Sequence, residues 1–261
     1  MSRTFAAAVA LLAVSIPSMA DAQINFQKSG YYVAMGDSVA AGEGAMPVTN
    51  GYAYQLYEQG TFGPKQQMDF ANLAVRGGRS WEFRDQQVSQ VLCAEPAQRP
   101  TVVTITVGAN DFLRGDNNIA GIALRVVEGI KILLYNGTPA VSSPVIDPVS
   151  NTPCRRLTNV TILVSNYLSI PHPIPAINTQ LDMALRGFDQ ALRFILGQLP
   201  VPPGSRVAVV DVFHPSVDQN GLVLIEKRNG FNGPLDFEVH PTNAGHSFIA
   251  RQFAAVWEGL Q

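Results

Sequence analysis

The sequence is poor in cysteine and in charge, and it has no long apolar run beyond its first residues. Two cysteines occur in 261 residues, too few to form a zinc site by themselves. Charged residues make up 15% of the chain, the net charge is −2 and no block of like charge is present, which argues against a nucleic-acid partner. The motif G-x-S-x-G is absent, which argues against the α/β-hydrolase fold.

The first residues are typical of a secretory signal. Arg3 precedes an apolar run over residues 5–14, and Ala20-Asp21-Ala22 fits an A-x-A cleavage site. The run is too short for a permanent membrane span. We therefore expect a signal peptide over residues 1–22 and a soluble, secreted or periplasmic protein over 23–261. That length fits a single α/β domain.

Cys93 and Cys154 are the two cysteines. In an exported protein two cysteines most economically form one disulfide, which we expect here. The alternative is a pair of unrelated buried thiols. Neither is a credible nucleophile.

Apolar and β-branched runs alternate with amphipathic segments along the chain. The runs predict five strands, and the segments between and after them predict helices, so we expect an α/β fold with a parallel sheet and right-handed crossovers. The expected strands are residues 31–35, 68–75, 101–107, 160–168 and 205–213, and the expected helices are 51–60, 81–92, 119–134, 177–199 and a terminal helix N-capped by Thr242.

The first strand stops abruptly at Gly36-Asp37-Ser38 and gives way to small residues. Ligands of parallel sheets sit at the carboxyl ends of the strands. A serine there can present its hydroxyl and its backbone N–H to a small molecule. Ser38 is therefore the candidate nucleophile, although Gly, Asp and Ser are also common in simple turns.

Three further blocks follow in order, and two of them also lie at expected strand ends: NLAVRGG at residues 72–78, VGAND at 107–111 and VHPTNAGH at 239–246. Together with the GDS stretch they resemble the four ordered blocks of the GDSL/SGNH hydrolase family. The resemblance spans nearly the whole mature chain.

The resemblance implies a three-layer α/β/α sandwich with a five-stranded parallel sheet, the flavodoxin-like SGNH hydrolase fold. It implies that Ser38 is the nucleophile and His240 the general base. The backbone N–H groups of Ser38 and Gly77 and the side-chain amide of Asn110 would then bind the oxyanion. The implied reaction is hydrolysis of a small-molecule ester, a lipid or an acylated sugar, with no metal and no organic cofactor. We expect a monomer.

Each assignment has a structural alternative. Gly77 and Gly78 fit a tight turn, and the choice between them rests on the family pattern. Asn110 could cap the helix that follows it. Asp37 and Asp111 are expected to brace loops through backbone N–H groups, and His246 is expected to be a packed or locally capped helix residue.

The base and its acid are less clear than the nucleophile. Asp211 and His214 also match the family's Asp-x-x-His spacing, but the block around His240 leads into the terminal helix as the family's last block does. Three residues before His240 stands Phe237, where the family places its acid. We expect Glu238 to orient His240, with Asp236 or a backbone carbonyl as alternatives.

The missing acid leaves a second functional class open. An exported ligand-binding protein on the same scaffold, without turnover, would share the blocks but not the chemistry.

Overall fold

The computed structural model describes residues 30–95, 98–169, 175–217, 224 and 240–261. The expected signal peptide, Asp236 and Glu238 lie outside these residues. None of the described helices is long and apolar enough to cross a membrane.

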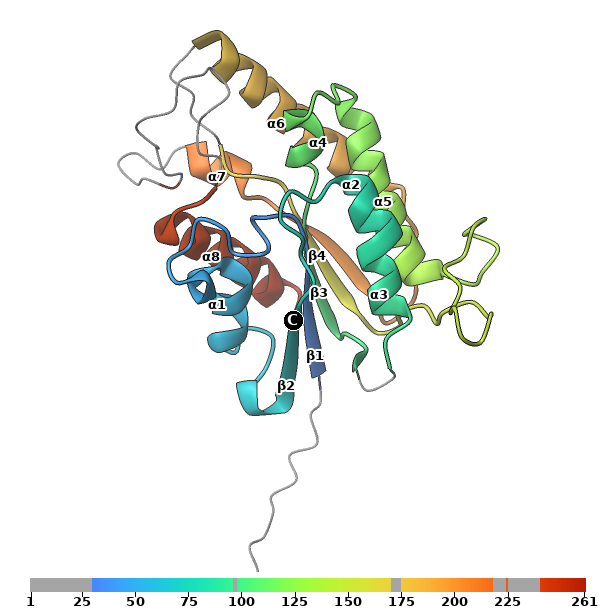
Figure 1. Ribbon diagram of the computed structural model, residues 1–261. Helices are drawn as coiled ribbons and strands as arrows, with labels where there is room; N and C mark the ends of the chain where they lie inside the picture. Colours follow the sequence, from blue (N-terminus) through green and yellow to red (C-terminus); the bar gives the residue numbers. More distant parts are fainter. Residues whose placement is uncertain (1–29, 96–97, 170–174, 218–223, 225–239) are drawn as a thin grey trace, which may run out of the picture.

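A five-stranded parallel sheet forms the centre of the molecule, in the order β2-β1-β3-β4-β5 (Figure 1). Each strand pairs with its neighbours in parallel, which confirms the expected sheet. The order reverses between β1 and β3, where ligands of such sheets bind. The strands are β1 (Gly30–Gly36), β2 (Met68–Asn72), β3 (Val102–Thr106), β4 (Thr161–Ser165) and β5 (Arg206–Val210).

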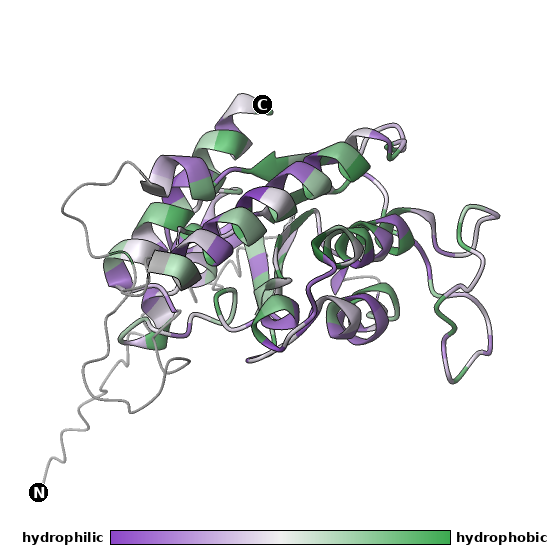
Figure 2. Ribbon diagram, turned by 90° about the horizontal axis from the view of Figure 1, so that it is seen from above, coloured by the Kyte–Doolittle hydropathy of each residue, from purple (hydrophilic) through white to green (hydrophobic). Residues whose placement is uncertain are grey.

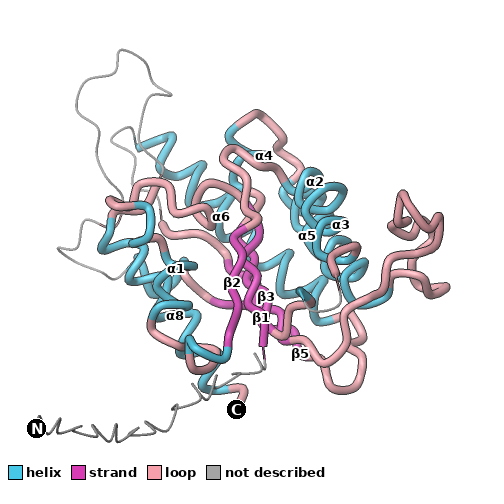
Figure 3. Tube along the Cα trace, turned by 60° about the horizontal axis from the view of Figure 1, so that its bottom comes forward, coloured by secondary structure: helices cyan, strands magenta, loops and turns pink. Residues whose placement is uncertain are grey.

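Helices cover both faces of the sheet, so the three-layer α/β/α architecture is confirmed. In Figures 1 and 3, α1 and α8 lie together on one side, and α2, α3 and α5 lie on the other. Helix α6 packs against α5. The helices are α1 (Tyr52–Glu58), α2 (Ser80–Glu82), α3 (Val88–Leu92), α4 (Ala109–Leu113), α5 (Ile119–Tyr135), α6 (Pro175–Gly197), α7 (Phe213–Val217) and α8 (Asn243–Gly259).

The central strands are buried as their composition predicts. All five residues of β3 and the last five of β1 are buried. Strands covered on both faces need apolar side chains at odd and at even positions, because successive side chains point to opposite faces of the sheet. The long helices are instead amphipathic, and Figure 2 shows hydrophobic and hydrophilic residues side by side along them.

Several expectations differ from the structure in detail, and strands β2 and β4 end earlier than expected, at Asn72 and Ser165. The helix expected over residues 81–92 is one helical stretch with a π-helical segment, Phe83–Gln87, between α2 and α3. Strand β5 ends at Val210, so Asp211 follows the strand, and Phe213 begins α7. Asn110 lies inside the short helix α4 rather than capping a helix.

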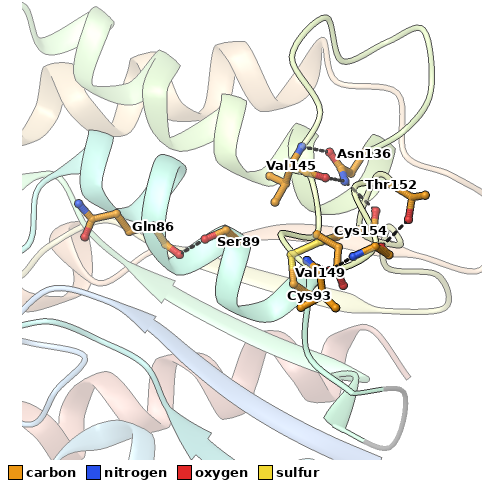
Figure 4. The surroundings of a disulfide bond; sticks show 10 residues. Gln86, Ser89, Cys93, Asn136, Val145, Val149, Thr152 and Cys154 are labelled. Carbon is orange, nitrogen blue, oxygen red and sulfur yellow. Dashed lines mark hydrogen bonds between the residues drawn. A yellow bond between two sulfur atoms is a disulfide. The ribbon is translucent and has the colours of Figure 1, made fainter.

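The expected disulfide is confirmed: Cys93, just after α3, is bonded to Cys154 (Figure 4). The segment before Cys154 is also held by Asn136, which follows α5. Its amide donates to the carbonyls of Val145 and Cys154 and accepts from the N–H of Val145. These bonds tie the Pro- and Ser-rich loop to the body of the molecule.

Candidate active site

Gly36 ends β1 in a conformation that only glycine tolerates. Its φ is +129°, and a Cβ at this position would lie 1.9 Å from the carbonyl oxygen of Thr106 on β3. The side chain of Gln87, in the π-helical segment, bonds both backbone polar groups of Gly36: it accepts from Gly36 N–H at 2.7 Å and donates to Gly36 C=O at 2.8 Å. The chain therefore leaves the sheet in one defined direction, toward Ser38.

Ser38 lies directly after this turn and is nearly buried, with 6% of its surface exposed. Its Oγ lies 2.9 Å from Nε2 of His240. The Ser38 carbonyl accepts a hydrogen bond from Glu43 N–H, whereas the Ser38 N–H bonds to none of the described residues. Ser38 thus offers two groups: a hydroxyl beside the His240 imidazole, and a backbone N–H without a partner among the described residues.

Asp37 braces the turn that carries Ser38, as expected. Its Oδ1 accepts from Val39 N–H at 2.9 Å, and its Oδ2 accepts from the Tyr167 hydroxyl at 2.5 Å. The Tyr167 oxygen in turn accepts from the N–H of Ala109, at the start of α4. Burial raises the pKa of Asp37 to about 6, an effect that the two hydrogen bonds oppose.

After β2, the polar backbone groups of Gly78 are both hydrogen-bonded, whereas the N–H of Gly77 is not bonded within the described part of the chain. Gly78 N–H donates to Val75 C=O, and Gly78 C=O accepts from Nδ2 of Asn110 at 3.0 Å. Gly77, with φ +70°, leaves its N–H without a partner among the described residues. One amide hydrogen of Asn110 also stays available, because a side-chain amide carries two.

Asn72, which opens the second block, connects the two loops. Its Nδ2 donates to the carbonyl of Ala40 at 2.8 Å, and its Oδ1 accepts from Ala74 N–H. The loop after β2 is thereby attached to the turn that carries Ser38.

Asp111 braces a loop as predicted. Its two carboxylate oxygens accept from the N–H and the hydroxyl of Ser80, each at 2.7 Å. Arg125, from α5, contacts the same carboxylate at 3.2 Å.

His240 sits against Gly44 and Glu43. A Cβ on Gly44 would lie 2.9 Å from Cβ of His240 and 2.3 Å from the carbonyl oxygen of Pro241, so the two segments touch. A carboxylate oxygen of Glu43 lies 3.4 Å from Nε2 of His240, and the other pairs with Arg76 at 2.5 Å. The sequence analysis did not single out Glu43.

His246 is buried completely and links helix α8 to the loop after Ser38. Its Nδ1 accepts from Tyr52 N–H, and its Nε2 donates to the Glu43 carbonyl at 2.9 Å. Its contacts are therefore long-range, not the local cap that was one alternative. Burial lowers its pKa to about 4, so the ring is neutral at pH 7.

The competing pair, Asp211 and His214, also forms in the structure. His214 Nδ1 lies 2.9 Å from Oδ2 of Asp211. The pair follows β5, His214 is exposed, and Asp211 also contacts Asn166 and Arg193. No hydrogen bond joins either residue to Ser38. Within the described part of the chain, no group of three or more His, Cys, Asp or Glu residues is arranged to hold a metal ion.

Comparison with known proteins agrees with this architecture. The crystal structure of an acetyl esterase mutant with an acetate ion is similar, with a TM-score of 0.55 and 15% identity over 88% of this chain and 97% of the other. A carbohydrate esterase family 3 protein from Talaromyces cellulolyticus gives a TM-score of 0.54 and 16% identity over 88% and 97%. A lipolytic G-D-S-L family protein from Veillonella parvula DSM 2008 gives 0.53 and 17% over 87% and 98%.

At these identities the likeness shows the fold. A search of curated protein sequences found no match. The profile described as GDSL-like Lipase/Acylhydrolase, however, matches residues 32–253, which include Ser38, Gly77, Asn110 and His240. The chain therefore belongs to the GDSL-like lipase/acylhydrolase family.

Proposed function

We propose that this protein is a serine hydrolase that cleaves carboxylic esters through an acyl-enzyme on Ser38. The observation that carries the proposal is the 2.9 Å contact between Ser38 Oγ and His240 Nε2. A serine hydroxyl is a weak nucleophile until an adjacent base takes its proton, and this distance permits the transfer. Membership of a family of esterases and acylhydrolases supports the same reaction class.

In the proposed mechanism His240 Nε2 accepts the hydroxyl proton as Ser38 Oγ attacks the ester carbonyl. The imidazolium then donates that proton to the leaving alcohol, which leaves an acyl group on Ser38. Water, deprotonated by the same nitrogen, attacks the acyl carbonyl; the bond to Ser38 Oγ then breaks, the imidazolium returns its proton to Oγ, and the carboxylic acid is released.

Three donors are proposed to bind the oxyanion of both tetrahedral intermediates. They are the N–H groups of Ser38 and Gly77 and the second amide hydrogen of Asn110. The two N–H groups have no partner among the described residues. The bond from Asn110 to Gly78 C=O holds the side-chain amide in place, so its remaining hydrogen needs no reorganisation during the reaction.

Glu238 remains the proposed acid, with Asp236 or a backbone carbonyl as alternatives. A carboxylate would fix the imidazole tautomer and stabilise the imidazolium, whereas a carbonyl would supply only a dipole. Changing a triad acid to its amide lowers kcat by about 10,000-fold. A loss below ten-fold in Glu238→Gln, beside an inactive His240→Ala, would indicate a Ser-His dyad.

The proposed substrate is a small-molecule ester, from a lipid or an acylated sugar. We further propose that the protein acts after export as a single domain over residues 23–261. The disulfide supports export, because such bonds persist in oxidising compartments.

The test is covalent labelling together with turnover. The purified protein is incubated with a fluorophosphonate, the adduct is mapped by mass spectrometry, and hydrolysis of a short p-nitrophenyl ester is measured. We expect an adduct on Ser38 and no turnover in Ser38→Ala or His240→Ala. His214→Ala is the matched control, because it also removes a carboxylate-paired histidine, and it should keep its activity.

Two results would contradict the proposal. Activity retained in His240→Ala but lost in His214→Ala would move the base to the pair after β5. Neither adduct nor turnover in correctly folded wild-type protein would favour the alternative, an exported ligand-binding protein.

A further inference from the structure

An open cavity of about 280 Å³ lies beside the proposed oxyanion donors and is rich in arginine. In Figures 1 and 3 the helices that carry its lining, α2, α4 and α5, lie side by side at the same end of the sheet. Its lining residues are Arg79, Trp81, Asp111, Arg114, Asp116 and Arg125.

The two aspartates of this cavity share one cationic partner, Arg125, and accept further hydrogen bonds from neutral groups. Asp111 accepts from Ser80 and contacts Arg125, as described above. Asp116 accepts from the N–H of Asn118 at 3.0 Å and pairs with Arg125 at 2.5 Å. These bonds lower the pKa of Asp116, so it stays ionised and engaged with Arg125.

The other two guanidinium groups do not pair with these aspartates. Arg114 is exposed and forms no ion pair or side-chain hydrogen bond with the described residues. Arg79 lies over the ring of Trp81, and its buried Nε has no hydrogen-bond partner in the described chain. Its nearest carboxylate, from Glu82, is 3.7 Å away, an ion-pair distance that is too long for a hydrogen bond.

The cavity adjoins the proposed reaction centre. A Cβ on Gly77 would lie 3.0 Å from Nη2 of Arg114, so this guanidinium rests against the loop whose N–H is a proposed oxyanion donor. Asp111, in the cavity wall, follows Asn110 directly in α4. The cavity therefore borders the loop that carries one proposed oxyanion donor and the helix that carries another.

We propose that this cavity binds an anionic substituent of the substrate, a carboxylate, phosphate or sulfate carried by the ester, between Arg79 and Arg114. The inference rests on the proposed function and names its substrate class. A guanidinium presents donors in a planar fork that suits such oxyanions, and pairs of this kind are stronger than neutral hydrogen bonds. Trp81 holds Arg79 in position by its contact with the guanidinium.

The first experiment uses two matched pairs of esters. Phenyl acetate and 4-acetoxybenzoate differ by a carboxylate on the alcohol side, and phenyl butyrate and monophenyl succinate differ by one on the acyl side. Within each pair the readout is the anionic-to-neutral ratio of kcat/KM. We expect Arg114→Gln and Arg79→Gln each to lower this ratio about ten-fold in one pair, as loss of a charged hydrogen bond does.

Arg251→Gln is the matched control. Arg251 is an exposed arginine on α8, on the opposite side of the sheet, so its replacement should leave both ratios unchanged. Intrinsic reactivity cancels, because each variant is compared with wild type on the same esters. An unchanged ratio in both cavity variants, or an equal fall in the control, would overturn the proposal.

A second measurement separates this inference from the proposed function. Calorimetric titration of Ser38→Ala, with and without Arg114→Gln, compares the binding of the anionic and neutral esters and needs no turnover. Arginine-dependent binding of the anionic ester without hydrolysis by wild type would support the cavity and refute the hydrolase. Hydrolysis of the anionic and neutral esters without any charge dependence would support the hydrolase and refute the anion-binding cavity.

Two further substrates distinguish the sources of the anion. Lysophosphatidylglycerol offers a lipid phosphate, and an O-acetylated glucuronic acid offers a sugar carboxylate. Arg114-dependent turnover of either one supports the subsite and identifies its natural class. Turnover of both at rates that Arg114→Gln does not change would count against it.

Discussion

Asn110 combines a structural bond with a proposed catalytic one. One amide hydrogen is committed to Gly78 C=O, and the other is free to meet the oxyanion. A donor held by a backbone carbonyl is already oriented before substrate binds, which is the condition for strong electrostatic stabilisation.

We expect Asn110→Ala to lower kcat by about 100- to 1,000-fold with little change in KM, because the bond forms chiefly in the transition state. Steady-state kinetics on a p-nitrophenyl ester measures both constants. Thermal unfolding of the variant checks that the loss is not a folding defect. A kcat within a few-fold of wild type would leave the side chain with only its structural bond.

Two buried titratable residues near the site have opposite effects on stability as pH changes. The raised pKa of Asp37, about 6 against 3.8, stabilises the folded state fully below pH 3.8, and this contribution is lost as pH rises through 6. The lowered pKa of His246, about 4 against 6.5, stabilises it above pH 6.5, and this contribution is lost as pH falls through 4. The two effects largely cancel between pH 4 and 7.

Replacing either residue should expose the pH dependence of stability that the other one contributes. Each shift of about two units corresponds to roughly 3 kcal/mol. Between pH 7 and pH 4, Asp37→Asn should therefore lose roughly 2–3 kcal/mol more of its unfolding free energy than wild type. His246→Gln, whose amide can replace both ring bonds, should lose roughly 2–3 kcal/mol less. Urea unfolding at several pH values measures both, and parallel curves for all three proteins would refute the assignment.

At the scale of elements, the site depends on how closely the loop after Ser38 meets the segment before α8. Gly44 touches both His240 and Pro241, and Glu43 C=O is held by His246 from α8. The proposed nucleophile and base are therefore positioned by two loops that pack directly on each other, although 202 residues separate Ser38 from His240.

Gly44→Ala should separate the base from the nucleophile. The methyl group would displace the His240 segment, and a shift of about 1 Å can cost about 100-fold in rate. Gly115→Ala is the matched control, since its φ of +91° equals that of Gly44, +90°, but a Cβ there meets nothing within 4 Å. Both variants bear the same backbone strain, so equal activities would show that the contact with His240 is unimportant.

At the scale of the whole molecule, the disulfide joins the end of α3 to the loop between α5 and β4. Cys93 and Cys154 are 61 residues apart, and the loop between them contains β3, α4 and α5. Closing a loop of this length restricts the unfolded chain and is expected to contribute about 4 kcal/mol.

The double variant Cys93→Ser with Cys154→Ser should lose about 2–5 kcal/mol of unfolding free energy, measured by denaturant titration. Wild type under reducing conditions should lose the same amount, which serves as the control for the new serines. A loss under 1 kcal/mol would mean that the segment is held mainly by the hydrogen bonds of Asn136 and not by the covalent link.

The sequence alone determined the family, the five parallel strands and the cysteine pair, because these depend on local composition, on block order and on how few cysteines there are. Only the tertiary structure decided which histidine stands beside Ser38: Asp211 and His214 have the family's spacing, yet His240 is the residue in contact. It also revealed Gln87, Glu43 and the cavity at Arg114. Such contacts arise because a parallel sheet brings together strand ends and loops that are far apart along the chain, and spacing in the sequence does not encode that proximity.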